Sequence, residues 1–306
     1  MKKYTLFALL CAVILSCGGN NQGSGEKAQT VQSSAKFPYP KVPAMMQSQE
    51  QAAEWFAVHF WDKYFEDENR SCDSITVEQA YSEYAALLIT APPAIMVKAQ
   101  DRMLSEAEKA GELKRISALA DKYFFDANSP YRNEECYIPV LEKVLSCPES
   151  DDAAKEKAAH LLPLISLNRL GTVAADFTYT LKNGRTARMH DIKAERLIMF
   201  FSNPGCTSCK EIIEALKGSP KVSAMLADGS LKILNLYPDS DLGEWYRYMS
   251  HYPEEWINAF DAEGAVNGDT GEKIYYLRAI PSLYLLDAEK RVLCKDAPTE
   301  LVLNML

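Results

Sequence analysis

The feature that most constrains this chain is a pair of cysteines, Cys206 and Cys209, placed between a predicted strand and a predicted helix. The apolar run Leu197 to Phe201 ends at the turn-forming residues 202–205, and a helical pattern then continues to Lys217. Unpaired backbone N–H groups and the helix dipole stabilise a thiolate at a helix N-terminus, so a cysteine there ionises below the ordinary pKa of about 8.5. The pattern predicts a redox pair in which Cys206 attacks a disulfide and Cys209 resolves the mixed disulfide.

Two other interpretations of this pair stay open. A structural zinc site needs four ligands, but the chain has no second CxxC and its four histidines show no ligand-like spacing. The pair could also be structural and inert, because CxxC occurs often by chance. The strand–turn–helix context favours the redox interpretation. We therefore expect no metal, and no cofactor apart from a redox-active Cys206–Cys209 disulfide.

A second indicator is Pro281, which directly precedes the apolar run Ser282 to Asp287. Proline has no N–H to donate to a strand ladder, so it is awkward at the start of a central strand. A cis Ile280–Pro281 bond would resolve this and bring the backbone beside the CxxC, although a trans proline that opens a strand is the commoner arrangement. We predict that Ile280 and Pro281, together with Pro204 and Gly205, position the substrate.

Length and charge limit the possible functions. The 306 residues are enough for two domains, each with its own core. The net charge is −9 and basic runs are absent, so nothing indicates nucleic-acid binding. The sequence does not indicate an oligomeric state.

The N-terminus has the pattern of an export signal. Residues 1–17 combine Lys2-Lys3 with a short apolar stretch, and Ile14-Leu15-Ser16-Cys17 resembles a bacterial lipobox, in which the cysteine is lipidated. Ordinary secretion with cleavage nearby is the alternative. Residues 18–44 begin with a Gly-, Ser-, Asn- and Gln-rich stretch that predicts a flexible tether. We expect a lipid-anchored protein of the cell envelope that faces the periplasm or the exterior, where disulfides persist.

Residues 45–170 predict an all-helical domain. Apolar residues recur there at helical spacing in roughly six segments, of which Gln51 to Phe65 is the first. The polar segment 125–135 predicts a turn between two helices, with Asn133 capping the second. The alternative is that Arg132 and Glu134 form a docking site for the redox domain.

Residues 171–306 predict an α/β domain. Asn183-Gly184 is a strong hairpin signal, and strands then alternate with helices before a final hairpin and helix. We expect a mixed central sheet with helices on both faces. Irregular spacing leaves open the pairing of the other mature cysteines, which are Cys72, Cys136, Cys147 and Cys294.

Four segments carry a resemblance to a known family: NSPYRNEE, ADFTYTLKNG, FFSNPGCTSCK and AIPSLYLLD. They resemble bacterial thioredoxin-like lipoproteins with a helical N-terminal domain of unknown function, related to membrane-tethered periplasmic reductases. The Gly171 to Phe177 segment resembles the start of their redox domain. The resemblance implies a thiol-disulfide oxidoreductase that acts on exported thiol or disulfide proteins and exchanges electrons with a donor or acceptor at the membrane.

The chain departs from that family at three positions near the cysteines. Phe200 stands where a buried carboxylate is usual, Gly205 where an aromatic residue is usual, and Ile212 where the periplasmic reductases often have glutamate. A proton acceptor for the second step is therefore not evident. The alternative function is a non-catalytic lipoprotein that holds a protein partner. A peroxidase is less favoured, because neither cysteine has the spacing around a peroxidatic cysteine.

Overall fold

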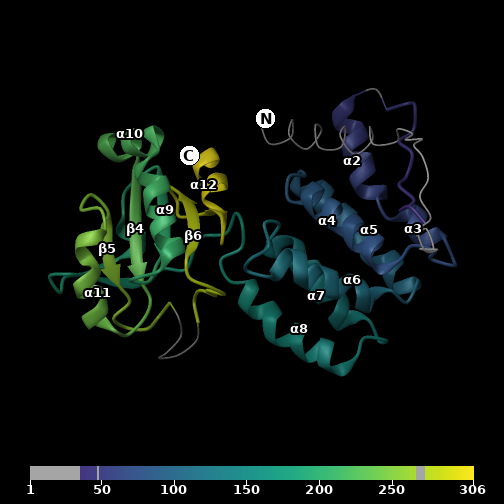
Figure 1. Ribbon diagram of the computed structural model, residues 1–306. Helices are drawn as coiled ribbons and strands as arrows, with labels where there is room; N and C mark the ends of the chain where they lie inside the picture. The colour runs from purple at the N-terminus through teal and green to yellow at the C-terminus, as the bar shows by residue number, and fades with distance from the viewer. Residues whose placement is uncertain (1–34, 47, 267–272) are drawn as a thin grey trace, which may run out of the picture. The chain divides into compact units, whose positions relative to one another are not determined.

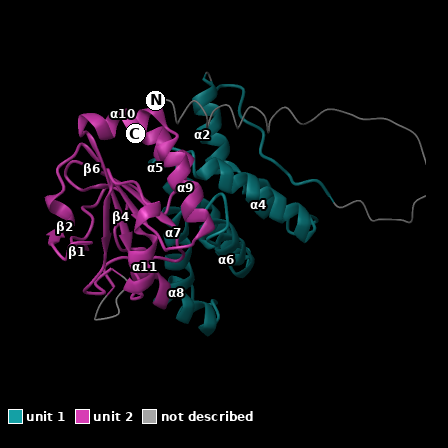
Figure 2. Cartoon of the chain, turned by 60° about the vertical axis from the view of Figure 1, so that its left-hand side comes forward, with its two compact units in different colours: residues 1–159 teal, residues 160–306 magenta. Residues whose placement is uncertain are grey.

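The computed structural model describes residues 35–46, 48–266 and 273–306 (Figure 1). The predicted leader with Cys17 and the first part of the tether lie outside the described residues. The chain divides into two compact units between Ala159 and His160 (Figure 2). No helix in the described ranges is both long enough and apolar enough to cross a membrane.

The N-terminal unit is all-helical, as predicted. Its helices are α2 (Gln49–His59), α3 (Asp62–Glu66), α4 (Ser74–Leu88), α5 (Pro93–Lys109), α6 (Leu113–Ala120), α7 (Glu134–Ser146) and α8 (Asp152–Ile165), and the π-helical turn η1 (Asp121–Phe125) follows α6. Asn133 caps α7 as predicted, because its side chain accepts from the N–H groups of Glu135 and Cys136. The docking role of Arg132 and Glu134 stays a prediction.

The first predicted helix, Gln51 to Phe65, is in fact two helices. The chain turns at Phe60 and Trp61, between α2 and α3. Neighbouring residues point about 100° apart on a continuous helix, so only one of these two side chains could face the core fully. The turn leaves Phe60 0% and Trp61 3% exposed, with ring centroids 5.6 Å apart.

The C-terminal unit is built on a seven-stranded mixed sheet in the order β2-β1-β5-β4-β3-β6-β7. The strands are β1 (Thr178–Leu181), β2 (Thr186–Arg188), β3 (Arg196–Phe201), β4 (Leu231–Tyr237), β5 (Ile257–Phe260), β6 (Ser282–Asp287) and β7 (Val292–Cys294). Strands β3, β4 and β5 are parallel, and the other pairings are antiparallel. The predicted hairpin joins β1 to β2, with Gly184 at φ 77°.

The prediction of helices on both faces of the sheet is corrected. In the described residues, one buried layer receives side chains from all four α-helices of this part: α9 (Thr207–Lys217), α10 (Pro220–Asp228), α11 (Leu242–Tyr248) and α12 (Thr299–Met305). The opposite layer is closed by residues 174–192, Val266 and residues 274–277. Right-handed crossovers from β3 to β4 and from β4 to β5 move in one direction across the sheet, so they place α9 to α11 on the same face.

The division between the units falls inside α8, eleven residues before the predicted start at Gly171. The end of α8 belongs to the C-terminal unit, since Lys295 Nζ donates to the carbonyls of Ile165 at 2.9 Å and Leu167 at 2.5 Å. The segment after α8 is held in the same way, because Asn168 Nδ2 donates to the Ile274 carbonyl at 2.8 Å. These contacts join distant parts of the chain, so the local sequence pattern does not reveal them.

Asp176, in the segment that leads into β1, joins the two open ends of the β1–β2 hairpin. Its carboxylate accepts from the backbone N–H of His190 at 2.9 Å and from Arg188 Nε at 2.7 Å. Burial alone would raise the pKa of Asp176, but these two donors outweigh it and lower the pKa. The folded-state pKa therefore lies below the unfolded value of about 3.9. The carboxylate stabilises the fold above that value, and this contribution is lost as the pH falls through the folded-state pKa.

We expect Asp176→Asn to lower the free energy of unfolding by about 1.5–3 kcal/mol at neutral pH, because it weakens two hydrogen bonds to a charged group. The difference from wild type should shrink as the pH falls below about 4. Urea unfolding of both proteins at neutral pH and below pH about 4 measures this difference in the free energy of unfolding. The control is Asp191→Asn, at an exposed carboxylate in the turn that follows β2. A loss that is equal at both pH values would contradict this account.

Candidate functional site

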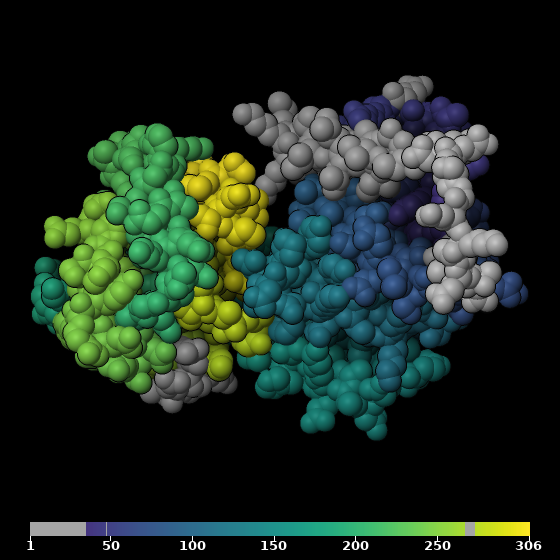
Figure 3. Space-filling model, viewed as in Figure 1, coloured from purple at the N-terminus to yellow at the C-terminus, as the bar shows by residue number. Residues whose placement is uncertain are grey.

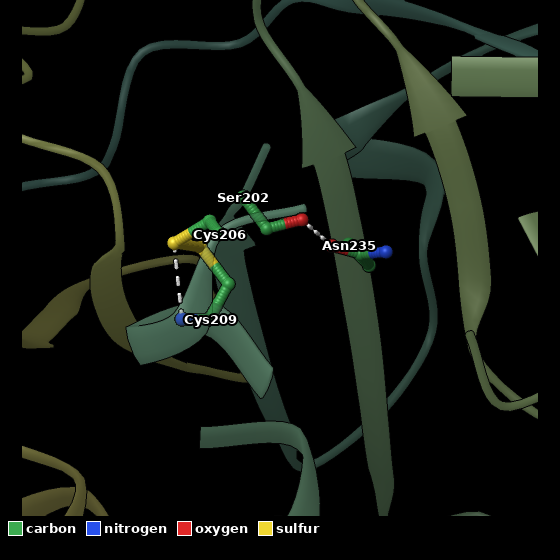
Figure 4. The surroundings of a disulfide bond; sticks show 4 residues. All are labelled: Ser202, Cys206, Cys209 and Asn235. Carbon is green, nitrogen blue, oxygen red and sulfur yellow. Dashed lines mark hydrogen bonds between the residues drawn. A yellow bond between two sulfur atoms is a disulfide. The ribbon is translucent and has the colours of Figure 1, made fainter. Parts of the chain in front are cut away.

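The candidate site begins where β3 ends. Residues 202–205 form the turn, and Gly205 has φ 71°, which glycine adopts without strain. Cys206 follows as the N-cap of α9, and its Sγ accepts the backbone N–H of Cys209 at 3.1 Å (Figure 4). A sulfur in this position receives a hydrogen bond and the positive end of the helix dipole, and both favour a thiolate at Cys206 once the pair is reduced.

Cys206 and Cys209 form a disulfide, with their Cα atoms 5.2 Å apart. The two cysteines differ in exposure. Cys206 is partly exposed, whereas Cys209 is only 2% exposed and belongs to the buried layer that also contains Ile213 and Leu216. An incoming disulfide can therefore reach Cys206 but not Cys209, which matches the roles of attacking and resolving cysteine.

Ile280–Pro281 is a cis peptide bond, as predicted. Ser282, the next residue, pairs in register with Phe201 at the end of β3. Pro281 therefore lies at the same edge of the sheet as the turn that leads to Cys206. The turn with Pro204 and Gly205 thus follows β3 at the edge where Ile280 and Pro281 precede β6, and the role of these four residues in positioning a substrate stays a prediction.

A part-buried ion pair that involves a residue shortly before this proline was not predicted. Arg278 pairs with Asp296, and their side chains are 6% and 15% exposed. Asp296 also accepts from Ser282 Oγ at 3.3 Å. The pair therefore joins the residues before and after Pro281 to the segment that follows β7. The only signal for this pair in the sequence is a charged residue, Arg278, in the mostly apolar segment that precedes β6.

A second unpredicted feature is a line of polar side chains in the buried layer to which Cys209 belongs. Ser202 is 0% exposed and Asn235, in the middle of β4, is 1% exposed. Their side chains are joined by a hydrogen bond of 2.5 Å (Figure 4). The signal in the sequence is an asparagine inside the otherwise apolar run of β4. Phe200, which stands where thioredoxins usually have a buried carboxylate, is fully buried and lies against Trp256, with ring centroids 6.3 Å apart.

The remaining cysteines do not contribute to this site. Cys72, Cys136, Cys147 and Cys294 are buried, and none forms a disulfide within the described chain. In the helical unit, Glu108, Cys147 and Glu149 approach one another closely enough to hold a cation. They already have partners, because Lys143 donates to Glu108 at 2.9 Å and the Cys147 thiol donates to Glu149 at 3.3 Å.

Residues 16–168 match the model of a domain of unknown function, DUF5106. No curated protein matches the chain. A solved thioredoxin-like protein from Bacteroides caccae is 37% identical, covers 89% of this chain and 98% of its own, and superposes with a TM-score of 0.80.

Two further solved structures match the C-terminal part alone. The C-terminal domain of an uncharacterised protein from Bacteroides fragilis is 44% identical over 45% of this chain and 97% of its own, with a TM-score of 0.43. The thioredoxin domain of a thiol-disulfide oxidoreductase from Bacteroides vulgatus is 18% identical over 45% of this chain and 94% of its own, with a TM-score of 0.39. The similarity to the Bacteroides caccae protein spans nearly the whole of both chains, and by it this chain belongs to the thioredoxin-like proteins, with DUF5106 as its N-terminal half.

Proposed function

We propose that this protein is a thiol-disulfide oxidoreductase that acts on exported proteins. The observation that carries the proposal is the asymmetric cysteine pair, with Cys206 partly exposed at the start of α9 and Cys209 buried one turn further on. A helix N-terminus favours the thiolate at the accessible sulfur, and only a thiolate attacks a disulfide.

The exchange has two steps. The Cys206 thiolate attacks one sulfur of a substrate disulfide, so that the substrate S–S bond breaks and the second substrate sulfur leaves as a thiolate. Cys209 then loses its proton to solvent and attacks Cys206, which forms the Cys206–Cys209 disulfide and releases the first substrate sulfur. The substrate gains two electrons and this protein loses two. A dithiol donor then reduces the Cys206–Cys209 disulfide for another round. In the opposite direction, the Cys206–Cys209 disulfide oxidises a substrate dithiol, and a disulfide acceptor re-oxidises the protein.

Turnover of a model substrate tests this proposal. The purified chain should accelerate the reduction of insulin disulfides by dithiothreitol, because Cys206 provides a more reactive thiolate than the reagent does. The same chain, reduced and then blocked with iodoacetamide, should give only the rate of the reagent. Cys72→Ser, at a buried cysteine of the helical unit, should keep full turnover. A wild-type rate equal to that of the blocked chain would favour a binding module without catalysis.

We further propose that Cys17 carries a lipid that tethers the protein to a membrane of the cell envelope. The support is the sequence alone: the leader pattern and the lipobox-like residues that end at Cys17. Cys17→Ser should move the protein from the membrane fraction to the soluble fraction, or leave it unprocessed with its leader attached. Membrane attachment that survives this substitution in the processed protein would contradict the proposal.

A further inference from the structure

Three polar side chains form a hydrogen-bonded line that runs from the end of β3 across β4 to β5. The line consists of Ser202, Asn235 and Asn258. Ser202 Oγ donates to Asn235 Oδ1 at 2.5 Å, and Asn235 Nδ2 donates to Asn258 Oδ1 at 2.9 Å. Asn258 Nδ2 then donates to the carbonyls of Pro253 at 2.8 Å and Trp256 at 3.4 Å, in the connection between α11 and β5.

The line lies on the face of the sheet that α9 covers. Side chains alternate between the faces of a strand, and Ile198 and Phe200 belong to the same buried layer as Cys209. Ser202 continues that alternation. Asn235 faces the same layer, because it lies between Ile233 and Tyr237 in the alternation of β4. The three residues are therefore a polar strip inside an apolar layer.

Asn258 is partly exposed, but burial of the Ser202 hydroxyl and the Asn235 amide has a cost that only hydrogen bonding offsets. The sheet does not need these side chains, because its strands are already paired by their backbones in this region. Apolar side chains would fill the same layer without that requirement. A buried polar network of this kind fixes one geometry, since each bond has a defined direction and length.

The geometry that this line fixes is the start of the turn. Ser202 makes two hydrogen bonds to β4, since its backbone N–H donates to the Leu236 carbonyl at 3.1 Å and its hydroxyl donates to Asn235. The Asn203 carbonyl, one residue later, accepts the N–H of Cys206 at 3.4 Å. Figure 4 shows the Ser202 hydroxyl pointing toward Asn235 and away from the two sulfurs. The line can therefore act on the sulfurs only through the turn.

We propose that the Ser202–Asn235–Asn258 line is a positioning network for the redox pair, which holds the turn so that the Cys206 sulfur faces Cys209. This inference rests on the proposed exchange at Cys206 and Cys209. A turn held in place raises the effective concentration of the Cys206 thiol near the Cys209 thiol, because less conformational entropy is lost when the S–S bond forms. The network thus stabilises the disulfide relative to the dithiol.

The test is the equilibrium of the full chain with reduced and oxidised dithiothreitol. In that reaction the two thiols of the protein lose two protons and two electrons and form one S–S bond, while the S–S bond of the reagent is broken and reduced. Ser202→Ala should lower the equilibrium constant for formation of the protein disulfide about tenfold, which corresponds to a reduction potential about 30 mV less negative. Asn235→Leu should do the same.

Two further variants separate this role from a loss of general stability. The double variant Ser202→Ala/Asn235→Leu should shift the equilibrium no more than one single variant does, because both changes break the same line. Asn168→Ala removes a buried asparagine that bonds the Ile274 carbonyl and the Ala175 N–H, and should leave the equilibrium unchanged. Ser202→Ala deletes only a hydroxyl, so it decides the question even where Asn235→Leu does not fold.

An equilibrium constant for Ser202→Ala within about twofold of wild type would overturn the inference, since the expected change is about tenfold. So would an equal shift in Asn168→Ala, or additive shifts in the double variant. A wild-type chain whose Cys206–Cys209 pair does not equilibrate with dithiothreitol would instead contradict the proposed function, so the two failures are distinct.

Discussion

Cys206→Ser should reduce disulfide exchange to the uncatalysed rate, because it removes the only cysteine of the pair that substrate can reach. Cys209→Ala should also stop turnover, but at a different stage. Cys206 would still attack, and the mixed disulfide with the substrate would persist because no thiol resolves it. Insulin reduction measures the first effect, and mass spectrometry of the trapped adduct under non-reducing conditions measures the second.

The two variants must differ for the assigned roles to hold. We expect the covalent adduct with Cys209→Ala and none with the double variant Cys206→Ser/Cys209→Ala. Cys294→Ser, at a buried cysteine of the same unit, is the matched control and should behave as wild type. Trapping through Cys209 in the Cys206→Ser variant would show that the roles are reversed.

Arg278→Met should be the most destabilising of the substitutions proposed for the C-terminal unit. It leaves the part-buried Asp296 carboxylate without the Arg278 charge, and loss of one partner of an ion pair costs up to about 3–5 kcal/mol when the pair is buried. The double variant Arg278→Met/Asp296→Asn should recover most of that loss, because an asparagine is neutral and tolerates the left-handed backbone at residue 296, where φ is 46°. Urea unfolding of the single and double variants measures both effects.

The control for this prediction is an exposed pair. Lys63 and Glu66 are 56% and 60% exposed, so Lys63→Met should leave the free energy of unfolding close to that of wild type. The exchange activity of Arg278→Met should also fall at temperatures where it is still folded, because the ion pair holds the residues on either side of Pro281. A variant as stable as wild type would show that the pair contributes little.

Local signals in the sequence were enough to predict much of the redox unit. The hairpin follows from Asn183-Gly184, and the helix after Cys206 follows from its apolar spacing. The cis bond at Pro281 was predictable because a proline cannot pair inside a sheet and the CxxC lay at a fitting distance in the chain. Each of these signals involves residues close together in the sequence.

The features that were missed depend on contacts between distant residues. Asn235 and Asn258 meet only because β4 and β5 pair in that register, and Arg278 meets Asp296 across the end of the sheet. The placement of the helices on one face was missed for a similar reason, since it depends on the order of strands in space and not on their order in the chain. The α2–α3 turn was missed because helical periodicity continues through Phe60 and Trp61.

The central claim is that Cys206 and Cys209 interconvert between dithiol and disulfide as one two-electron pair. Alkylation of the full chain, equilibrated over a range of dithiothreitol ratios and then digested, tests it most directly, because cleavage after Arg196 and Lys210 leaves both cysteines in one peptide. We predict that this peptide changes from no label to two labels at a single midpoint, with the two-electron slope. Two labels at every ratio, or a stable species with one label, would contradict the account.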